Sequence, residues 1–356
     1  MQRLKMYQQR VKEAIEAIKK GEMIIIMDDE DRENEGDLVM AGIFSTPQKI
    51  NFMAQEARGL ICVSITQELA KKLDLPPMVQ KNDSNHETAF TISIDAKEAK
   101  TGISAYERDM TIKLMCESNA KPSDFVRPGH IFPLIAKEGG VLVRTGHTEA
   151  SVDICRLAGV APISVICEIM KKDGTMAGRG DKFLLDFASL HNLKILYVSD
   201  IIHYRLNFEN LLRETSRKNA VFMGVACEKI TFIDHLEREH IAFAFSTSTP
   251  HKTKPLIRFH NMRSDLELLE NTEEWNALLK SIEYLKEQGG YLIVLNTHSL
   301  HISKACGDMK DFGIGAQILK RLGIEDFVLL SSCSANKGEY NALSGFNLHL
   351  VEKIEV

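Results

Sequence analysis

Residues 23–37 read MIIIMDDEDRENEGD, an apolar run that passes directly into a segment in which seven of ten residues are acidic. The apolar run is typical of a buried strand, so the acidic segment is expected at one end of a sheet. Carboxylates this dense repel one another unless a cation binds among them. Mg²⁺ takes one or two protein carboxylates and leaves positions for substrate oxygens. The pattern therefore favours a divalent-metal site, with a solvated run of charge as the alternative.

The sequence around this stretch predicts an α+β N-terminal domain with a mixed sheet and flanking helices. Apolar residues recur at helical spacing over 8–20, and Gly21 is expected to end that helix. Further strands are expected at 60–65, 89–94, 141–144, 163–170 and 193–197, and helices at 47–57, 66–73, 104–118, 149–158 and 180–191.

A second domain is expected after a polar, weakly periodic stretch at 206–220. We therefore divide the chain into domains 1–205 and 206–356. Strands at 221–226, 242–247, 291–296 and 327–332 and helices at 272–288 and 313–322 predict an α/β layer in the second domain.

Composition excludes several classes of protein. With 44% hydrophobic and 26% charged residues, the 356-residue chain is not predominantly disordered. Its formal net charge of -5 disfavours a chain-wide nucleic-acid binder. No apolar run is long enough for a membrane span, so we expect no membrane partner. The seven cysteines include no C-x-x-C pair, and their odd number does not fit a framework of disulfides. Both features suit a reduced cytoplasm.

A second candidate group reads Arg144-Thr145-Gly146-His147-Thr148, directly before a predicted helix. A planar guanidinium, hydroxyl donors and a glycine beside a helix N-terminus suit a bound phosphate. His147 could ligate a metal through a neutral imidazole nitrogen. The alternative is a capped helix start that includes an incidental histidine.

Two further titratable residues stand out. Glu168 lies within an apolar strand, where burial tends to raise a carboxyl pKa and suits a general acid or base. His130 follows Arg127-Pro-Gly and precedes an apolar strand. The alternatives are an outward-pointing acid on an edge strand and a structural histidine. Cys62 is interpreted as a buried apolar residue, and Thr101-Gly-Ile-Ser-Ala as an anion site or a helix cap.

Several of these motifs, in this order, closely resemble the 3,4-dihydroxy-2-butanone-4-phosphate synthase family of riboflavin biosynthesis. The matching stretches are DDEDRENEGDL (28–38), RPGH (127–130), RTGHTEASVD (144–153) and ICEIM (166–170), with further likeness in TAFTISID (88–95) and TGISA (101–105). The resemblance covers residues 8–205.

The resemblance implies a metal-dependent lyase that converts D-ribulose 5-phosphate to L-3,4-dihydroxybutan-2-one 4-phosphate and formate with Mg²⁺ or Mn²⁺. It implies metal ligation by Glu33 and His147 and essential catalytic roles for His130 and Glu168. Substrate contacts are implied for Arg32, Glu33, Asp37, Arg144, Thr145, Gly146, His147, Thr148 and Glu168. Cys62 and Thr101 would line the pocket. A homodimer with composite active sites and a cytoplasmic location are also expected.

The C-terminal part resembles a degenerate GTP cyclohydrolase II domain. Asp311 to Leu319 and Gly345-Phe-Asn-Leu348 resemble stretches of that family. The family binds zinc through one cysteine and a downstream Cys-Asp-Cys, whereas this chain has no cysteine between Cys227 and Cys306. We therefore expect a structural or interaction module that is not catalytic.

Three alternatives remain open from the sequence. The chain could be a bifunctional enzyme that also has GTP cyclohydrolase II activity. His298, His301 and Cys306 could form a different metal site, although solvated loop residues are the preferred interpretation. The N-terminal site could instead serve a metal-dependent sugar-phosphate isomerase or aldolase, which would release no formate.

Overall fold

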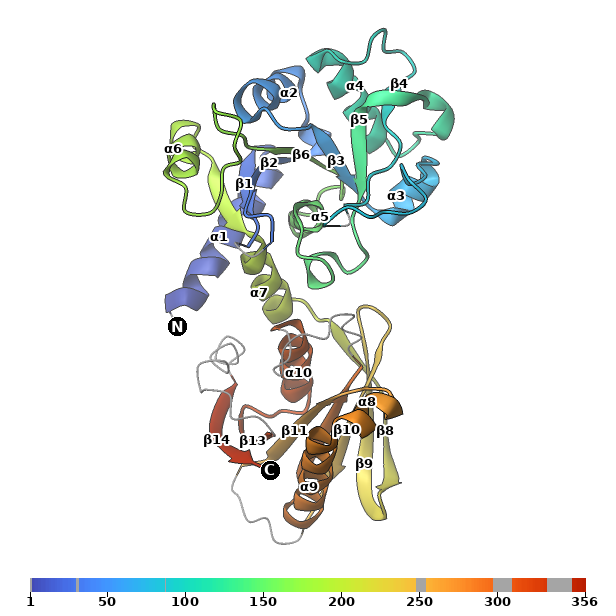
Figure 1. The fold of residues 1–356 in the computed structure, drawn as a ribbon, viewed down its shortest axis with the longest axis vertical. Helices are drawn as coiled ribbons and strands as arrows, with labels where there is room; N and C mark the ends of the chain where they lie inside the picture. The colour runs from blue at the N-terminus through green and yellow to red at the C-terminus, as the bar shows by residue number, and fades with distance from the viewer. Residues whose placement is uncertain (1, 30–31, 87, 248–253, 297–308, 332–347) are drawn as a thin grey trace. The chain divides into compact units, whose positions relative to one another are not determined.

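The structure is a computed structural model that describes residues 2–29, 32–86, 88–247, 254–296, 309–331 and 348–356. The chain divides into two compact units, Gln2–Tyr204 and Arg205–Val356. Each unit is built around a seven-stranded mixed sheet (Figure 1). The expected fold classes, α+β followed by α/β, agree with this arrangement.

The sheet of the first unit has the strand order β4-β5-β3-β6-β2-β1-β7. Its strands are β1 (Ile24–Met27), β2 (Gly36–Ala41), β3 (Cys62–Ile65), β4 (Ile94–Ala96), β5 (Phe125–Ile135), β6 (Ser164–Glu168) and β7 (Lys194–Tyr197). The β1–β7 and β3–β5 pairs are parallel, whereas β1–β2, β2–β6, β3–β6 and β4–β5 are antiparallel. The hairpin between β1 and β2 carries the acidic segment.

Helices cover both faces of this sheet. They are α1 (Gln2–Lys19), α2 (Pro47–Phe52), α3 (Gln67–Lys72), α4 (Ala105–Cys116), α5 (His147–Leu157), α6 (Lys182–Leu190) and α7 (Val198–Phe208), the last of which contains the boundary between the units. Short helical turns are η1 (Gly42–Phe44), η2 (Met53–Ala57), η3 (Pro122–Asp124) and η4 (Gly140–Leu142).

The two faces of the sheet have different occupants because side chains alternate along each strand. One face, with Leu38, Val63 and Cys167, packs in a core with side chains of α2, α4 and α6. The other face carries Asp37 and Glu168, and the helix that packs across its strands is α5. The candidate residues on β2 and β6 therefore lie beneath the start of α5.

Most predicted elements of this unit are present, with shifted ends. The first helix begins at Gln2 rather than at residue 8, and Gly21 follows it at φ +74° as expected. The predicted strand at 141–144 is wrong, because η4 occupies this place. Gly139 and Gly140 both have positive φ there, which turns the chain and stops an extended run.

The second unit has the strand order β14-β13-β11-β12-β10-β9-β8. Its strands are β8 (Leu212–Phe222), β9 (Val225–Asp234), β10 (Glu239–Phe245), β11 (Leu256–Asn261), β12 (Gly290–Leu295), β13 (Asp326–Ser331) and β14 (His349–Glu355), and its helices are α8 (Asp265–Glu270), α9 (Thr272–Gln288) and α10 (Met309–Arg321). The polar stretch at 206–220, expected as an irregular boundary, is instead the end of α7 and most of β8.

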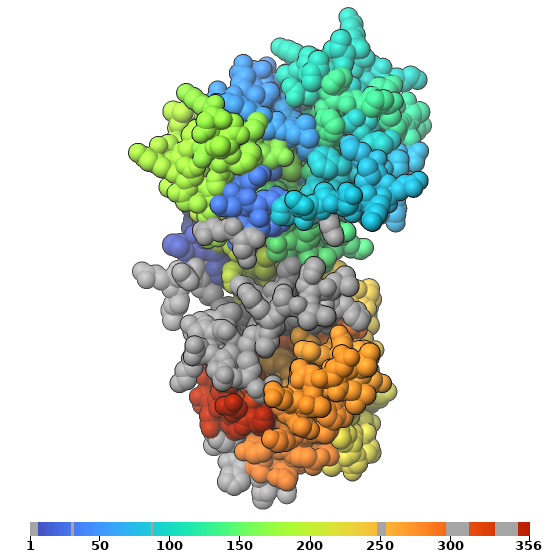
Figure 2. Space-filling view, viewed as in Figure 1, coloured from blue at the N-terminus to red at the C-terminus, as the bar shows by residue number. Residues whose placement is uncertain are grey.

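Two helices pack on opposite faces of the second sheet. Leu278, Ile282 and Leu285 of α9 join the core on the face that includes Leu256. On the other face, Gly315 of α10 packs directly against the ring of a residue in β11, Phe259. Figure 2 shows α8 and α9 as one continuous patch on the surface of this unit. Within the described part of the chain, every helix is too short or too polar to cross a bilayer.

Candidate active site

Asp28 organises the loop between β1 and β2. Its carboxylate is fully buried, and its Oδ1 accepts a hydrogen bond from the backbone N–H of Glu35 at 2.9 Å. Its Oδ2 accepts from Arg32 Nη1 at 2.8 Å and from the backbone N–H of Glu33 at 3.2 Å. These three bonds fold the loop back on itself and hold Arg32 against Glu33, whose Oε2 lies 2.9 Å from Arg32 Nη1.

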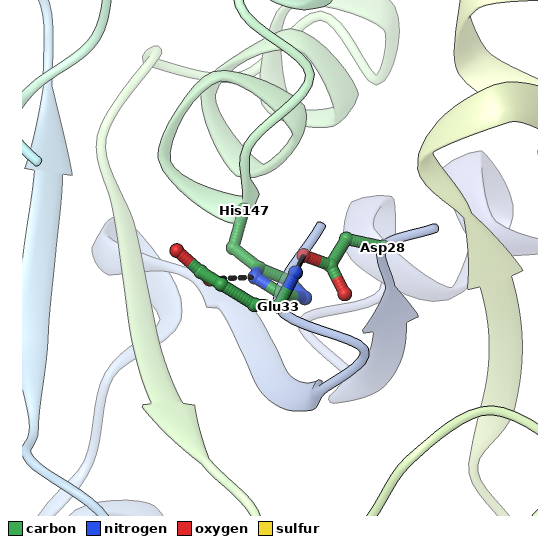
Figure 3. A group of neighbouring side chains, drawn as sticks. All are labelled: Asp28, Glu33 and His147. Carbon is green, nitrogen blue, oxygen red and sulfur yellow. Dashed lines mark hydrogen bonds and ion pairs between the residues drawn. The ribbon is translucent and has the colours of Figure 1, made fainter. Parts of the chain in front are cut away.

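His147 is the first residue of α5 and points toward this loop (Figure 3). Its Nε2 donates to the carbonyl oxygen of Glu35 at 3.2 Å. This bond leaves Nδ1 facing Glu33 Oε2, 3.7 Å away. One ligand atom each from Asp28, Glu33 and His147 lies within 4.8 Å of the other two. The structure therefore brings together the two residues predicted as metal ligands and adds Asp28 to the group.

The charges of this group are strongly coupled. Burial alone would lower the pKa of His147, but the carboxylates of Asp37, Glu33 and Asp28 raise it to about 9. Burial likewise opposes ionisation of Glu33, yet His147 and Arg32 lower the pKa of Glu33 to about 2. The pKa of Asp37 is raised, chiefly by its complete burial. An excess of buried acid thus surrounds one imidazole.

The residues present fit a divalent cation. Oxygen from Glu33 and neutral imidazole nitrogen from His147 are suitable ligands for such an ion. The Nε2–H bond to the Glu35 carbonyl fixes the imidazole orientation and leaves the lone pair of Nδ1 available to a ligand. Asp37 Oδ1, 3.9 Å from His147 Nε2, is buried without a hydrogen-bond partner. A bound cation would lower the pKa of Asp37 and favour its ionised form.

Glu168 lies beside Asp37 in the antiparallel β2–β6 pair. Its Oε2 accepts a hydrogen bond from the backbone N–H of Leu60 at 2.8 Å. A Cβ on Gly59 would lie 2.4 Å from the Glu168 carbonyl oxygen, so only glycine allows this close contact. Glu168 is half-buried at the wall of an open pocket of about 470 Å³, which is lined by Glu35, Arg58, Gly59, Leu60, Glu168, Met170 and Met176.

His130 lies at the same end of the sheet as Glu168. Cys62 of β3 pairs with Ile166 of β6 and with Phe132 of β5. Glu168 lies two residues after Ile166 in β6, and His130 lies two residues before Phe132 in β5, so both lie toward the same end of the sheet. Side chains two residues apart in a strand share a face, so Glu168 and His130 lie on the face that carries Ile166 and Phe132. With strands about 4.8 Å apart, the two backbones are about 10 Å apart.

The Arg144–Thr148 segment leads directly into α5. Gly146 is the N-cap residue, and a Cβ there would lie 2.3 Å from Arg144 Nη1. Arg144 donates to Glu149 Oε2 at 2.6 Å, to the carbonyl oxygen of residue 86 at 2.9 Å and to Thr88 Oγ1 at 3.2 Å. The guanidinium is thus held by protein groups on several sides and is not the free fork that the sequence suggested. Thr148 is buried, and Thr145 is half-buried.

Three residues near these groups were not singled out from the sequence. Asp95 bonds His130 through both carboxylate oxygens, and buried Glu149 holds Arg144. Arg58 lines the pocket beside Glu168 and donates to the carbonyl oxygen of Met170 at 2.8 Å. Glu149 and Asp95 stand in two of the stretches that resemble the family, 144–153 and 88–95, but neither was given a role of its own, whereas Arg58 belongs to no motif.

Cys62 and Thr101, which the resemblance placed along the pocket, differ in their exposure. Cys62 is buried, and burial together with Glu168 and Asp37 raises the pKa of its thiol, which stays neutral. Thr101 is exposed and donates to Glu107 Oε2 at 3.0 Å. Several residues considered from the sequence lie outside the described residues: Glu30, Asp31, His298, His301, Cys306, Cys333 and 345–347.

Comparison with known families gives two matches along the chain. A family model described as 3,4-dihydroxy-2-butanone 4-phosphate synthase matches residues 12–204. A second model, described as GTP cyclohydrolase II, matches residues 301–355.

Similar proteins include the 3,4-dihydroxy-2-butanone 4-phosphate synthase of Helicobacter hepaticus, which is 87% identical over 99% of this chain and 100% of the relative. The protein of the same name from Campylobacter jejuni is 49% identical over 96% of this chain and 97% of its own. A riboflavin biosynthesis protein of Bacillus subtilis, RibBA, is 40% identical over 97% of this chain and 92% of its own.

Solved structures show the same likeness. RibBX, a two-domain 3,4-dihydroxy-2-butanone 4-phosphate synthase from A. baumannii, is 38% identical and superposes with a TM-score of 0.80, covering 97% of this chain and 99% of its own. A 3,4-dihydroxy-2-butanone 4-phosphate synthase in complex with two magnesium ions is 40% identical with a TM-score of 0.52, covering 56% of this chain and 97% of its own.

Proposed function

The chain belongs to the 3,4-dihydroxy-2-butanone 4-phosphate synthase family, and we propose that its first unit performs the reaction at the group formed by the β1–β2 loop, β6 and the start of α5. The protein is a metal-dependent enzyme of riboflavin biosynthesis that converts ribulose 5-phosphate to 3,4-dihydroxybutan-2-one 4-phosphate and formate. The assignments of single residues below are proposals.

We assign the metal to Glu33 and His147. The observation that carries this assignment is the convergence of their ligand atoms, with one from Asp28, within 4.8 Å. Asp28 is the weaker ligand candidate, because both of its oxygens already accept hydrogen bonds from the loop. Glu33 and His147 would hold a divalent ion there, which would supply a Lewis acid for a substrate carbonyl and hydroxyls. Both Mg²⁺ and Mn²⁺ suit this oxygen and imidazole set.

We assign the substrate phosphate to the N-terminus of α5. The backbone at Gly146 and the hydroxyls of Thr145 and Thr148 supply donors where the helix dipole favours an anion. Arg144 adds positive charge from a guanidinium that Glu149 holds in place. Anchoring the phosphate here orients the reacting carbons toward the carboxylates at the end of the sheet.

Proton transfer is assigned to His130 and Glu168. The two lie on one face and at one end of the sheet, with Glu168 exposed to the pocket. Each group can take a proton from a substrate carbon or hydroxyl and return it at a later step. Asp37 and Arg32 complete the substrate contacts: Asp37 lies beside Glu168, and Arg32 bridges Asp28 and Glu33.

A formate assay on the full chain tests this proposal. Purified protein with Mg²⁺ is expected to release one formate per ribulose 5-phosphate consumed, and to lose that activity on substitution of Glu168 or His130. Consumption of the sugar phosphate without formate would instead indicate an isomerase or an aldolase, since neither reaction releases a one-carbon fragment.

The second unit is assigned a non-catalytic role. The cyclohydrolase family's zinc cysteines have no counterpart between Cys227 and Cys306. We place the domain boundary at 205/206 and propose that residues 206–356 serve as an interaction or structural module. The competing function is a second hydrolytic activity on GTP, for which bound zinc at about one ion per chain would be the first sign.

The assembly and location of the protein are also proposals. A homodimer and a cytoplasmic location follow from the family resemblance. Reduced cysteines agree with the location: Cys62, Cys116, Cys155, Cys167 and Cys227 are all free thiols.

A further inference from the structure

Asp95 is a buried carboxylate directed at one of the two proposed catalytic residues. It lies in β4, is 5% exposed, and carries no assigned role. Its Oδ1 accepts from the backbone N–H of His130 at 2.9 Å, and its Oδ2 lies 2.8 Å from His130 Nδ1. Both hydrogen bonds of this carboxylate among the described residues therefore come from His130. The His130 side chain is 42% exposed, so its ring is reachable from solvent.

The backbone around this pair is shaped to hold it. The β4–β5 register shifts between Ile94 and Asp95, which leaves the chain before His130 as an insertion in β5. Gly129 in this insertion packs so closely on β4 that a Cβ would lie 2.0 Å from the Ile94 carbonyl carbon. Its N–H donates to Ser93 Oγ at 3.1 Å. The insertion is thus fixed against β4 at the point where Asp95 bonds His130.

A second segment covers the pair from the other side. Gly102, at φ +83°, has no room for a side chain, because a Cβ would lie 1.9 Å from Asp95 Oδ2 and 2.6 Å from His130 Nδ1. Glu107 holds this segment by accepting from the N–H of Lys100 at 2.7 Å and from Thr101 Oγ1 at 3.0 Å. The Thr101-Gly-Ile-Ser-Ala motif therefore covers the Asp95–His130 pair. Its Ser104 also caps α4 by accepting from the backbone N–H of Glu107 at 3.2 Å, which agrees with the helix-cap interpretation.

We infer that Asp95 is a positioning residue that fixes the tautomer of His130 and makes Nε2 the proton-transferring atom. This inference rests on the proposed catalytic role of His130. An ionised carboxylate only accepts hydrogen bonds, so a 2.8 Å contact requires the proton on Nδ1 and leaves the lone pair on Nε2. Nε2 takes one proton from the substrate and later returns it, while Asp95 stays ionised and stabilises the transient imidazolium.

The test compares Asp95→Asn with wild type in the full chain. The amide keeps the shape of the carboxylate but can donate to Nδ1, which favours the wrong tautomer. We expect kcat for formate release to fall by about 10²–10⁴-fold. The KM for ribulose 5-phosphate and the half-saturating Mg²⁺ concentration should change by less than about threefold, since neither depends on a proton transfer. Asp124→Asn is the matched control, because Asp124 caps the turn before β5 without contacting His130.

A spectroscopic readout separates positioning from folding. In protein labelled with ¹⁵N-histidine, the ring of His130, assigned by its loss in His130→Gln, should carry its neutral-form proton on Nδ1. In Asp95→Asn the proton should move to Nε2. The inference is overturned if wild type carries the proton on Nε2, or if Asp95→Asn retains kcat within about threefold.

The two levels of the proposal can fail separately. An active His130→Gln variant would remove the catalytic role of His130 and with it the basis of the inference. An inactive His130→Gln variant beside a fully active Asp95→Asn variant would leave the proposed function intact and overturn the inference alone.

Discussion

His147 is subject to two opposing demands. In the described structure its acidic neighbours raise its pKa to about 9 and so favour the protonated ring. A ring that ligates a cation must instead be neutral and offer a lone pair. The bond from Nε2 to the Glu35 carbonyl is compatible with both states, because Nε2 keeps its proton in each. Nδ1, which faces Glu33 in the structure, would be the nitrogen available to a bound ion.

Replacing His147 with alanine should weaken metal dependence. One of two proposed protein ligands is lost, so we expect the half-saturating Mg²⁺ concentration to rise at least about tenfold. The measurement is a titration of formate release with Mg²⁺ at saturating sugar phosphate. His349→Ala, at an exposed position in β14, is the control. An unchanged titration curve for His147→Ala would remove His147 from the metal site.

Replacing Glu168 with glutamine should separate binding from turnover. The amide keeps the size of the side chain but cannot exchange a proton at neutral pH, so kcat should drop by about 10²–10⁴-fold with KM nearly unchanged. Steady-state formate release measures both constants. Glu117→Gln, at the exposed end of α4, serves as the control. Near-normal turnover in Glu168→Gln would rule out the acid–base assignment.

Some residues of the site were predictable from the sequence and others were not. Glu33 and His147 stand in dense motifs, and the structure brings their side chains together. Asp95 stands 35 positions before His130, at the end of the stretch 88–95, and the pairing of β4 with β5 brings the two together. The protein partners of Arg144 were equally hidden, because one of them is a backbone carbonyl far along the chain.

At the scale of elements, the wrong predictions have local causes. Val141 and Leu142 are buried apolar residues, and a short apolar run does not distinguish a strand from a buried helical turn. Gly139 and Gly140, both at positive φ, favour the helical turn over a strand. The strand β8 is largely exposed and lies at one edge of its sheet, where its partner among the described strands is β9. Its sequence therefore lacks the alternation that would have marked it as a strand.

One turn of the second unit is held by a buried charge. Asp234 is fully buried at the end of β9 and accepts from His240 Nε2 at 3.1 Å and from Arg238 Nε at 2.7 Å. Burial opposes ionisation, but these bonds outweigh it and lower the pKa of Asp234. A carboxyl whose folded-state pKa is depressed stabilises the fold above its unfolded pKa, which is about 3.9, and this contribution is lost as pH falls through the folded value.

Asp234→Asn should therefore destabilise the second unit in a pH-dependent way. We expect a loss of about 2–4 kcal/mol at pH 7, since hydrogen bonds to a buried charge are broken, and a smaller difference from wild type as pH falls below about 4. The fluorescence of Trp275, the one tryptophan in the chain, reports urea unfolding of this unit. Exposed Asp265→Asn is the control. An equal loss of unfolding free energy at pH 7 and below about pH 4 would contradict the electrostatic explanation.

At the scale of the whole molecule, the first unit carries every described residue of the proposed active site. Its buried core draws on strands and helices that end before α7. The magnesium-bound structural relative matches 56% of this chain with 97% of its own length.

A chain that ends at Tyr204 should keep synthase activity. We expect kcat within about threefold of the full protein and a cooperative thermal transition, because the core of the first unit is retained. Formate release and a melting curve measured on the same preparation check this. An insoluble or inactive fragment would show that residues 205–356 are structurally required.

The sequence predicted the family of each part of the chain more directly than the boundary between the two units. The ordered motifs of residues 28–170 identified the family, which the match over residues 12–204 confirms. The match over residues 301–355 confirms the cyclohydrolase likeness of the C-terminal part. The division between the two compact units falls within α7, a continuous helix that leaves no break in periodicity to mark it.

The most direct test of the account is a parallel formate assay on full-length protein with Mg²⁺, using ribulose 5-phosphate in one reaction and GTP in the other. The account predicts formate from the sugar phosphate and none from GTP. Formate from both substrates would contradict the non-catalytic assignment of the second unit. No formate from ribulose 5-phosphate would contradict the central claim.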